Sequence, residues 1–165
     1  MKKILCFLAV ISALSKLGAS EFDMIPDLSF KTISYNDSEY KMVIVLRREI
    51  LQKPEEFICQ KEEINHIHIV GYLNGELCAS AALVPENDFV KMQRVVVKTE
   101  VQRQGIGSSL LKYCEEYAKS HSFTTIYCYS RIETIPFYLK NNYKVSGEVT
   151  YKNNIPHQKM TKLVH

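Results

Sequence analysis

The chain has 165 residues, of which 46% are hydrophobic and 24% are charged. This size and composition are those of one globular domain with its own core, and they leave no room for a second domain. The formal net charge is +3, and basic residues are interleaved with acidic ones instead of gathering in a stripe, which disfavours a nucleic-acid partner.

Residues 1–20 carry the pattern of a secretory signal peptide. The pattern consists of early lysines, an apolar run and small residues where a signal peptidase cuts, at Lys2, Lys3, Ile4–Leu14 and Gly18–Ser20. The apolar run is too short for a transmembrane helix, so we expect no stable membrane association. Two other interpretations stay open: the true start is Met24, or an amphipathic helix resembles a signal. The predicted domain covers residues 24–165.

Hydrophobic periodicity predicts strands and helices in alternation along the rest of the chain. The first part is expected to hold a strand at Phe30–Tyr35, a helix at Glu39–Leu51 capped by Asn36–Ser38 and ended by Pro54, a shorter helix at Glu55–Ile64, and strands at His66–Leu73, Glu76–Val84 and Val90–Val97. The second part is expected to hold a helix at Ile106–Ser120, a strand at Ile126–Ser130, a helix at Ile132–Asn141, and strands at Tyr143–Tyr151 and Pro156–Val164. Asn74–Gly75 is typical of a two-residue hairpin turn.

The cysteines and histidines show no spacing typical of a metal site. Without Cys6, the remaining cysteines have neither CxxC spacing nor histidines at zinc-finger distance, at Cys59, Cys78, Cys114 and Cys128. We predict that these thiols are free and buried. His66 and His68 alternate on a predicted strand but lack a third ligand, so they are predicted to be core or surface histidines, and no metal cofactor is expected.

The stretch VQRQGIGSSLL, at Val101–Leu111, places two glycines at a strand-to-helix junction. Backbone N–H groups at the start of a helix lie at the positive end of its dipole, and such an end suits a phosphate. A Walker loop requires a lysine where this chain has Ser108, and a dinucleotide fingerprint requires a third glycine where it has Leu110. The loop is therefore a plain turn or a phosphate loop of another type.

Two motifs resemble those of the GNAT superfamily of acetyl-CoA-dependent N-acetyltransferases. QRQGIG, at Gln102–Gly107, is similar to the pyrophosphate loop of that family, Q/R-x-x-G-x-G/A. IPFYLKNNYKV, at Ile135–Val145, is similar to its FYxxxGF segment, with Asn142–Tyr143 where Gly-Phe is commonest. LRREILQKP and the closing IPHQKM resemble segments of small bacterial members. The resemblance covers Phe30–Leu163 and implies an α/β fold with a mixed, mostly antiparallel sheet, flanked by helices and splayed at the acetyl-CoA site.

The resemblance implies that acetyl-CoA is the cosubstrate and that an amine attacks its thioester directly. Backbone amides of the strand Val90–Val97 would contact the pantetheine arm and the thioester carbonyl, and those of the glycine loop would hold the pyrophosphate. The cofactor-binding residues implied are Val95, Val97, Gln102, Arg103, Gln104, Gly105, Ile106, Gly107 and Ser108.

The resemblance also implies a catalytic role for Tyr138, at the position of the family's tyrosine that hydrogen-bonds and protonates the leaving thiolate. The alternative is a core aromatic residue. The general base is left open between Glu133, Glu148, His157 and a water chain. The resemblance places His157 in the acceptor pocket, because in that fold the loop into the last strand borders the acceptor side of the cleft. An imidazole there can accept a proton at neutral pH, and the alternative is a structural histidine that fixes the turn after Pro156. Two arginines each allow two roles, a substrate contact or a salt bridge within the protein, at Arg94 and Arg131.

The implied function is transfer of an acetyl group from acetyl-CoA to a primary amine of a small molecule or a peptide. The acetyl-CoA requirement implies a cytoplasmic protein, whereas a working signal in residues 1–20 would imply an exported one. A non-catalytic acyl-CoA-binding module and an exported binding protein on the same fold remain as alternatives. A homodimer is also left open.

Overall fold

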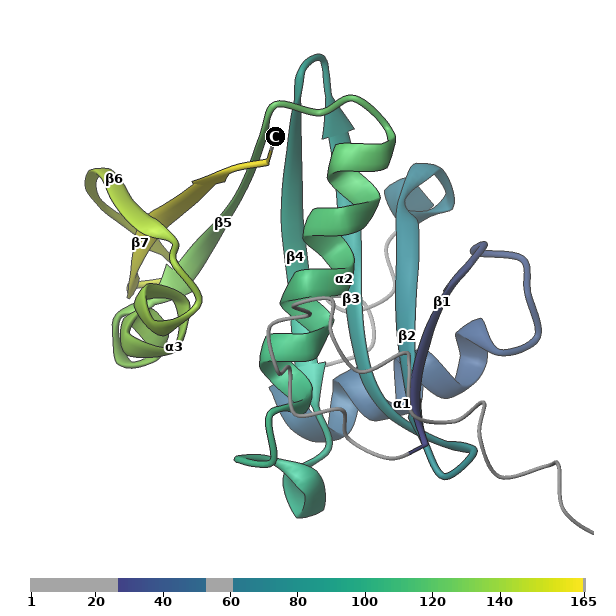
Figure 1. Ribbon diagram of the computed structural model, residues 1–165. Coiled ribbons are helices and arrows are strands. Elements are labelled where there is room, and N and C mark those ends of the chain that lie inside the picture. Colours follow the sequence, from purple (N-terminus) through teal and green to yellow (C-terminus); the bar gives the residue numbers. More distant parts are fainter. Residues whose placement is uncertain (1–26, 53–60, 165) are drawn as a thin grey trace, which may run out of the picture.

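The computed structural model describes residues 27–52 and 61–164 of the chain (Figure 1). The signal-like segment, Met24, Cys59 and most of the predicted helix Glu55–Ile64 lie outside the described residues. The cysteines within them, Cys78, Cys114 and Cys128, are free and buried, as predicted.

Within the described residues, seven strands form one mixed sheet in the order β1-β2-β3-β4-β5-β7-β6. The strands are β1 (Leu28–Ile33), β2 (Ile67–Leu73), β3 (Glu76–Glu86), β4 (Phe89–Val97), β5 (Thr125–Arg131), β6 (Lys144–Lys152) and β7 (Ile155–Leu163). Neighbouring strands are antiparallel except β4 and β5, which are parallel. The predicted fold class is therefore confirmed. Asn74 and Gly75 join β2 to β3 with φ values of 52° and 79°, as a type I′ turn requires.

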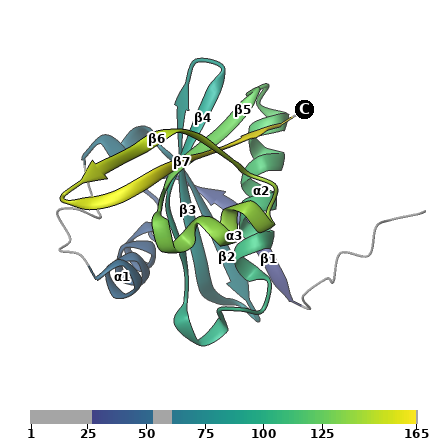
Figure 2. The same ribbon diagram turned by 90° about the vertical axis from the view of Figure 1, so that its left-hand side faces the viewer.

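Helices cover both faces of the sheet (Figure 2). Helix α1 (Tyr40–Leu51) lies on one face and α2 (Ile106–Ser120) on the other. Successive side chains of a strand point to opposite faces, so Ile69 of β2 joins the core beneath α2 and Val70 joins the core beneath α1. The shorter elements are η2 (Lys61–Asn65), η3 (Thr99–Val101), η4 (Ile132–Thr134) and α3 (Ile135–Lys140).

Two local predictions need correction. The predicted helix Ile132–Asn141 is two shorter elements, η4 and α3, and Pro136 lies in the first turn of α3, where its missing N–H costs no helical hydrogen bond. The predicted cap of α1 is also different. The N-cap residue is Glu39, which makes no side-chain cap bond, and the Asp37 carboxylate instead accepts the N–H of Ser34 at 2.6 Å.

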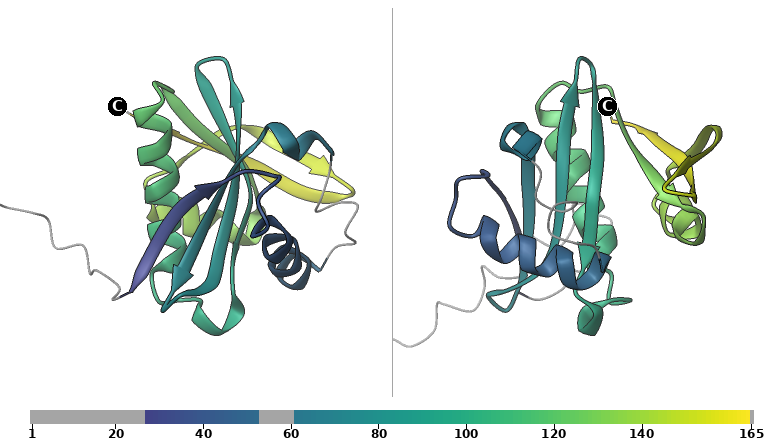
Figure 3. Two further views of the ribbon diagram at one scale, coloured as in Figure 1. Left: turned by 90° about the vertical axis from the view of Figure 1, so that its right-hand side faces the viewer. Right: turned by 180° about the vertical axis from the view of Figure 1, so that it is seen from behind.

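The sheet is split between β4 and β5. Their parallel pairing consists of the residue pairs Phe89–Thr125, Val90–Ile126 and Lys91–Tyr127. Beyond these pairs the strands diverge, and β5, β7 and β6 lean away together (Figure 3). Antiparallel pairing with β7 along the whole of β5 holds this second part of the sheet together. The splay that the resemblance implied is therefore present.

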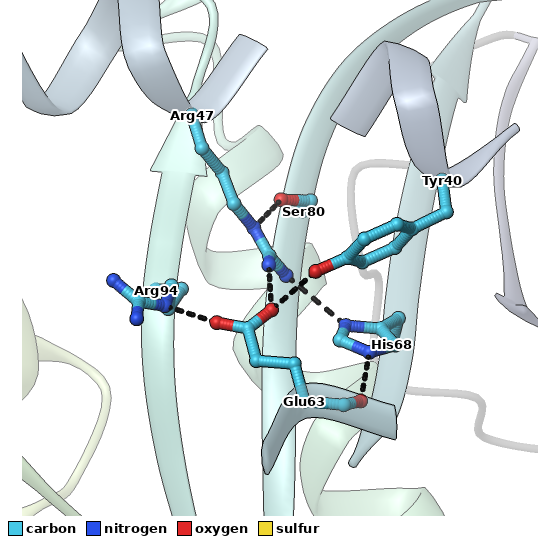
Figure 4. Close-up of polar contacts among 6 residues, drawn as sticks. All are labelled: Tyr40, Arg47, Glu63, His68, Ser80 and Arg94. Atoms are coloured by element: carbon cyan, nitrogen blue, oxygen red, sulfur yellow. Dashed lines mark hydrogen bonds and ion pairs between the residues drawn. The ribbon is translucent and has the colours of Figure 1, made fainter. Parts of the chain in front are cut away.

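A polar cluster lies buried between α1, η2 and the sheet (Figure 4). At its centre is the carboxylate of Glu63, which is fully buried. It accepts hydrogen bonds from Tyr40 Oη at 2.6 Å, from Arg47 Nη1 at 2.8 Å and from Arg94 Nε at 2.5 Å. Three donors on one carboxylate compensate for removing its charge from water.

Arg47 also connects this cluster to the sheet. Its Nε donates to Ser80 Oγ at 3.3 Å, and its Nη2 donates to His68 Nδ1 at 3.4 Å. Because a guanidinium can only donate, His68 Nδ1 accepts, and His68 Nε2 carries the hydrogen and donates to the Glu63 carbonyl oxygen at 2.9 Å. His68 is therefore a neutral core histidine, and burial lowers its pKa below the ordinary 6.5.

This burial predicts that stability falls in mild acid. Below pH 6.5 the unfolded chain takes up a proton at His68 that the folded chain does not. The contribution of neutral His68 to the free energy of unfolding is therefore complete above pH 6.5 and is lost as pH falls below it. The contribution to the slope of unfolding free energy approaches about 1.4 kcal/mol per pH unit. Urea unfolding between pH 7.5 and 5.5 measures it, and His68→Asn, less stable at pH 7.5, should show a flatter dependence. Equal slopes in both proteins would contradict the assignment.

Candidate active site

A cleft of about 880 Å³ occupies the split between the strands. It is lined by residues 92–97 of β4 and 128–131 of β5, with further residues from the loop before α2, from α3 and from the β6–β7 turn. It brings together most of the residues that the sequence indicated, namely Val95, Val97, Gln102, Arg103, Gly105, Gly107, Ser108, Glu133, Tyr138 and His157.

Three of the indicated residues are not among those lining the cleft. The side chain of Ile106 is in the core, 1% exposed, and Gln104 is exposed in the loop, so both would contribute through their backbone amides, as proposed from the resemblance. Glu148 is exposed on β6. Although Lys152 at the end of β6 lines the cleft, Glu148 does not, and this candidate base is not brought to the cleft.

Strand β4 bulges where it borders the cleft. Its pairing with β3 shifts between Ser80 and Ala82, so that Ala81 of β3 faces two residues of β4. One of them, Arg94, has a φ of 56°. A bulge bends its strand and breaks the ladder locally, which helps β4 to leave the path of β5.

The direction of the β4 amides follows from the ladder beyond this bulge. Lys98 N–H donates to Cys78 O at 2.7 Å, and hydrogen-bonded pairs recur at every second residue of an antiparallel ladder. Val96 therefore directs its backbone groups at β3, whereas Val95 and Val97 direct theirs at the split. The side chain of Gln102 agrees with this direction, because its Nε2 donates to Val97 O at 2.9 Å.

The glycine loop opens the N-terminus of α2 toward the cleft. Gly105 is the N-cap residue with a φ of 84°, which glycine adopts without a steric cost. Ser109 N–H donates to Gly105 O at 3.0 Å and begins the helical ladder, so the N–H groups at 106–108 precede it. Within this described helix no side chain caps the end, and the first turn holds no acidic residue. An anion is the natural partner of such an end.

Gly107 also allows α2 to approach α3. A Cβ built on Gly107 would lie 3.2 Å from the ring of Phe137 and 3.8 Å from the side chain of Val97. Even the smallest side chain would therefore displace the Phe137 ring. Two constraints therefore favour glycine here. A side chain would meet the Phe137 ring, and it would also take up space beside the N–H groups at the start of α2.

Tyr138 reaches the cleft from α3 and is 7% exposed. Its ring packs edge-on against Phe137 and Tyr143, with centroids 5.1 and 5.5 Å away. Its hydroxyl lies beside the thiol of Cys128 on β5. Burial, followed by the contact with Cys128, raises the pKa of Tyr138 well above 10, and burial raises that of Cys128 to about 12. Tyr138 therefore holds its proton at neutral pH.

His157 faces the cleft from β7, opposite Arg131 of β5 in the ladder. Its Nδ1 lies 2.8 Å from Ile155 O. A carbonyl oxygen only accepts, so Nδ1 carries the hydrogen, and in the neutral ring Nε2 keeps a lone pair. Arg131 and Glu133 form a loose pair at 3.8 Å, and both remain more than a third exposed, so each role proposed for Arg131 stays open.

Charge along the cleft is mainly positive. Its basic residues are Arg94, Arg103, Arg131, Lys140 and Lys152, against the acidic Glu133. Arg94 forms a salt bridge with Glu63 at 2.5 Å, which supports the intramolecular role for this arginine. A cleft of this charge attracts a ligand with several phosphates.

Two kinds of site were not found in the described part of the chain. No group of three or more His, Cys, Asp and Glu side chains within residues 27–52 and 61–164 could hold a metal ion. None of the helices in these ranges has the length and apolar character needed to cross a membrane. His66 and His68 lie near each other, with ring centroids 6.3 Å apart, and His68 is bonded within the core.

Sequence reasoning missed two contacts of the site. The contact of Cys128 with Tyr138 had a partial signal, because the period of two places Cys128 on the same face of its strand as the buried Ile126. The pair of Glu63 with Arg94 had none, since 31 residues separate its members and neither stands in a motif.

Comparisons with known proteins agree with this geometry. A family model described as "Acetyltransferase (GNAT) domain" matches residues 32–164. Among curated proteins, "Probable N-acetyltransferase 14" from Xenopus tropicalis is 31% identical over 86 residues, which cover 49% of this chain and 42% of that protein. The chain spans less than half the length of the curated relatives it matches.

Solved structures share the fold. Escherichia coli ElaA superposes with a TM-score of 0.71 at 20% identity, over 82% of this chain and 99% of that one. An aminoglycoside 6′-N-acetyltransferase complexed with coenzyme A superposes with a TM-score of 0.68 at 19% identity, over 83% and 97%. At such identities the likeness shows the fold alone. The family model, however, covers most of the sequence, and the chain belongs to the GNAT family of acetyltransferases.

Proposed function

We propose that this protein moves an acetyl group from acetyl-CoA to a primary amine of a small molecule or a peptide. Its family uses acyl-CoA cosubstrates and amine acceptors. The observation that carries the proposal is the continuity of the cleft, which runs from the open N-terminus of α2 to the amides of Val95 and Val97 and to Tyr138. A phosphate-bearing thioester requires all three features in one groove.

Acetyl-CoA supplies a thioester carbonyl for attack by the amine and a thiolate as leaving group. The amides at 106–108 of α2 hold the pyrophosphate, and Arg103 adds positive charge beside them. The amides of Val95 and Val97 serve the thioester carbonyl and the arm that precedes it, since N–H groups aimed at a carbonyl oxygen stabilise the negative charge that develops there. Gln102, bonded to Val97 O, keeps the loop and β4 in register.

Proton transfer falls to two side chains in the cleft. Tyr138 retains its proton in the resting protein because its pKa is raised, and a thiolate beside it is a stronger base than water. His157 has Nε2 available as an acceptor, so it can take a proton from the incoming ammonium directly or through a water. Glu133 is the other candidate base that lines the cleft.

A thiol-release assay with a panel of primary amines tests the function. Turnover that depends on the amine supports acetyl transfer. Tight acetyl-CoA binding without turnover would instead identify a non-catalytic acyl-CoA-binding module. The proposed location is the cytoplasm, because acetyl-CoA is the cosubstrate, and mass spectrometry of the native N-terminus tests whether residues 1–20 are removed.

Gly107→Val should weaken acetyl-CoA binding. A branched side chain at this position would cover the N–H groups at the start of α2, so we expect the dissociation constant to rise at least tenfold, or about 1.4 kcal/mol. Isothermal titration calorimetry measures it. Phe137→Leu in the same chain relieves the 3.2 Å contact with the ring. If the double variant recovers full affinity, Gly107 only makes room for Phe137.

Tyr138→Phe should lower turnover and leave binding nearly unchanged. It removes only the hydroxyl, and general acid catalysis contributes roughly 100- to 10,000-fold, so we expect a fall in kcat of about 10- to 1,000-fold because water replaces part of that effect. Cys128→Ala is the matched control, since it removes the hydroxyl's partner and keeps the acid. Unchanged kcat for Tyr138→Phe, with chemistry shown to be rate-limiting, would leave Tyr138 as a packing residue.

His157→Gln should change the pH profile of the reaction. If Nε2 of His157 takes the proton, the variant loses the acidic limb of kcat/KM for the amine, while acetyl-CoA affinity and Tm hardly move. Glu133→Gln is the parallel variant for the other candidate. A His157→Gln protein that melts several degrees lower and keeps its pH profile would show that the histidine only stabilises the turn before β7.

A further inference from the structure

Arg94 holds a backbone conformation that its side chain disfavours. Its φ is 56° inside the β4 bulge, in the left-handed region where residues with a Cβ are strained. Glycine is the usual residue at the left-handed position of such a bulge. Another interaction must therefore hold Arg94 in place, because the strain favours relaxation of the bulge.

The side chain of Arg94 is tied down at a point outside the strand. Its Nε donates to Glu63 Oε1 at 2.5 Å, and its side chain is 15% exposed (Figure 4). Glu63 comes from η2, between α1 and β2, and its side chain is fully buried. The ion pair thus connects the most strained point of β4 to a separate element.

Glu63 is itself fixed in position by the rest of the cluster. Its other oxygen, Oε2, accepts from Arg47 Nη1 at 2.8 Å and from Tyr40 Oη at 2.6 Å, both on α1. Burial acts to raise the pKa of Glu63, but Arg47, Tyr40 and Arg94 outweigh it and leave the pKa lowered. A carboxylate held from two sides is a rigid anchor for a third partner.

We propose that Glu63 and Arg94 are positioning residues that hold the β4 bulge, and through it the amides of Val95 and Val97, in the direction of the thioester carbonyl. The bulge inserts one extra residue of β4 between the pairs Ala82–Gln93 and Ser80–Val96, so its relaxation would slip the register by one residue and turn these two amides away from the split. The inference rests on the proposed function, because it assigns a purpose to amides that would serve the cosubstrate.

The decisive comparison is Arg94→Ala against Arg94→Gly. Both variants lose the guanidinium and its ion pair, but only glycine adopts a φ of 56° without strain. We expect kcat of Arg94→Ala to be roughly 5- to 30-fold below that of Arg94→Gly. Acetyl-CoA affinity should differ less than kcat between them, because the loop before α2, which would hold the pyrophosphate, is untouched. Equal kcat in the two variants would overturn the proposal.

A matched pair of controls separates this effect from general stability. Ser122 has a φ of 62° in the turn after α2 and does not line the cleft. Ser122→Ala and Ser122→Gly should therefore differ in Tm and not in kcat. A kcat difference of the same size at Ser122 would show that strain acts through stability alone, which also overturns the proposal.

Glu63→Gln tests the anchor by a double-mutant cycle. It weakens the hold on Arg94 in the parent chain, whereas in the Arg94→Gly chain that hold is already absent. Any folding cost through Arg47 occurs in both backgrounds and cancels. We expect Glu63→Gln to reduce kcat by a factor at least three times larger in the parent chain than in the Arg94→Gly chain, and the double-mutant cycle measures this difference. Equal losses in both backgrounds would remove Glu63 from the proposal.

Amide spectra distinguish this inference from the function on which it rests. Acetyl-CoA added to ¹⁵N-labelled protein should shift the Val95 and Val97 resonances in the parent and in Arg94→Gly, and shift them less in Arg94→Ala. If the parent binds no acetyl-CoA, the proposed function fails. If the parent binds and turns over acetyl-CoA and the shifts are alike in all three proteins, the proposed function stands and the positioning role fails.

Discussion

The short parallel pairing between β4 and β5 is the constraint on which the rest of the structure depends. Their ladder holds at Phe89–Lys91 and then ends, while β5 stays paired with β7 as far as Arg131. Backbone N–H and C=O groups need partners wherever they lie. Along the diverging edges those partners have to come from water or a ligand, so the break in the sheet is what makes it a binding site.

The buried cluster around Glu63 links this break to the other side of the sheet. It joins α1 through Tyr40 and Arg47 to β4 through Arg94. Removing one partner of a buried ion pair typically costs about 3–5 kcal/mol, because the other charge is left without compensation. The cluster therefore makes the shape of β4 depend on α1 and η2, elements that contribute little to the walls of the cleft.

Much of the fold was predictable because it follows local rules. The hairpin at Asn74–Gly75 needs two residues that tolerate positive φ, and the helix Ile106–Ser120 has an apolar stripe at helical spacing. The glycine loop before α2 could be predicted for the same reason, since its glycines and the helix after it are adjacent in sequence. Glu148 shows the limit of such reasoning, because it is exposed on β6 and outside the cleft, whereas Lys152 at the end of the same strand lines it.

The sequence by itself determined the elements, their order, the glycine loop and the family resemblance, because each depends on residues within a few positions of one another. Tertiary structure alone decided which side chains meet. Glu63 reaches Arg94 across 31 residues, and the thiol of Cys128 meets Tyr138 only because α3 folds back onto β5. The bulge at Arg94 is likewise decided by the tertiary structure. It depends on the register in which β3 pairs with β4, and that register is fixed only when the sheet is packed.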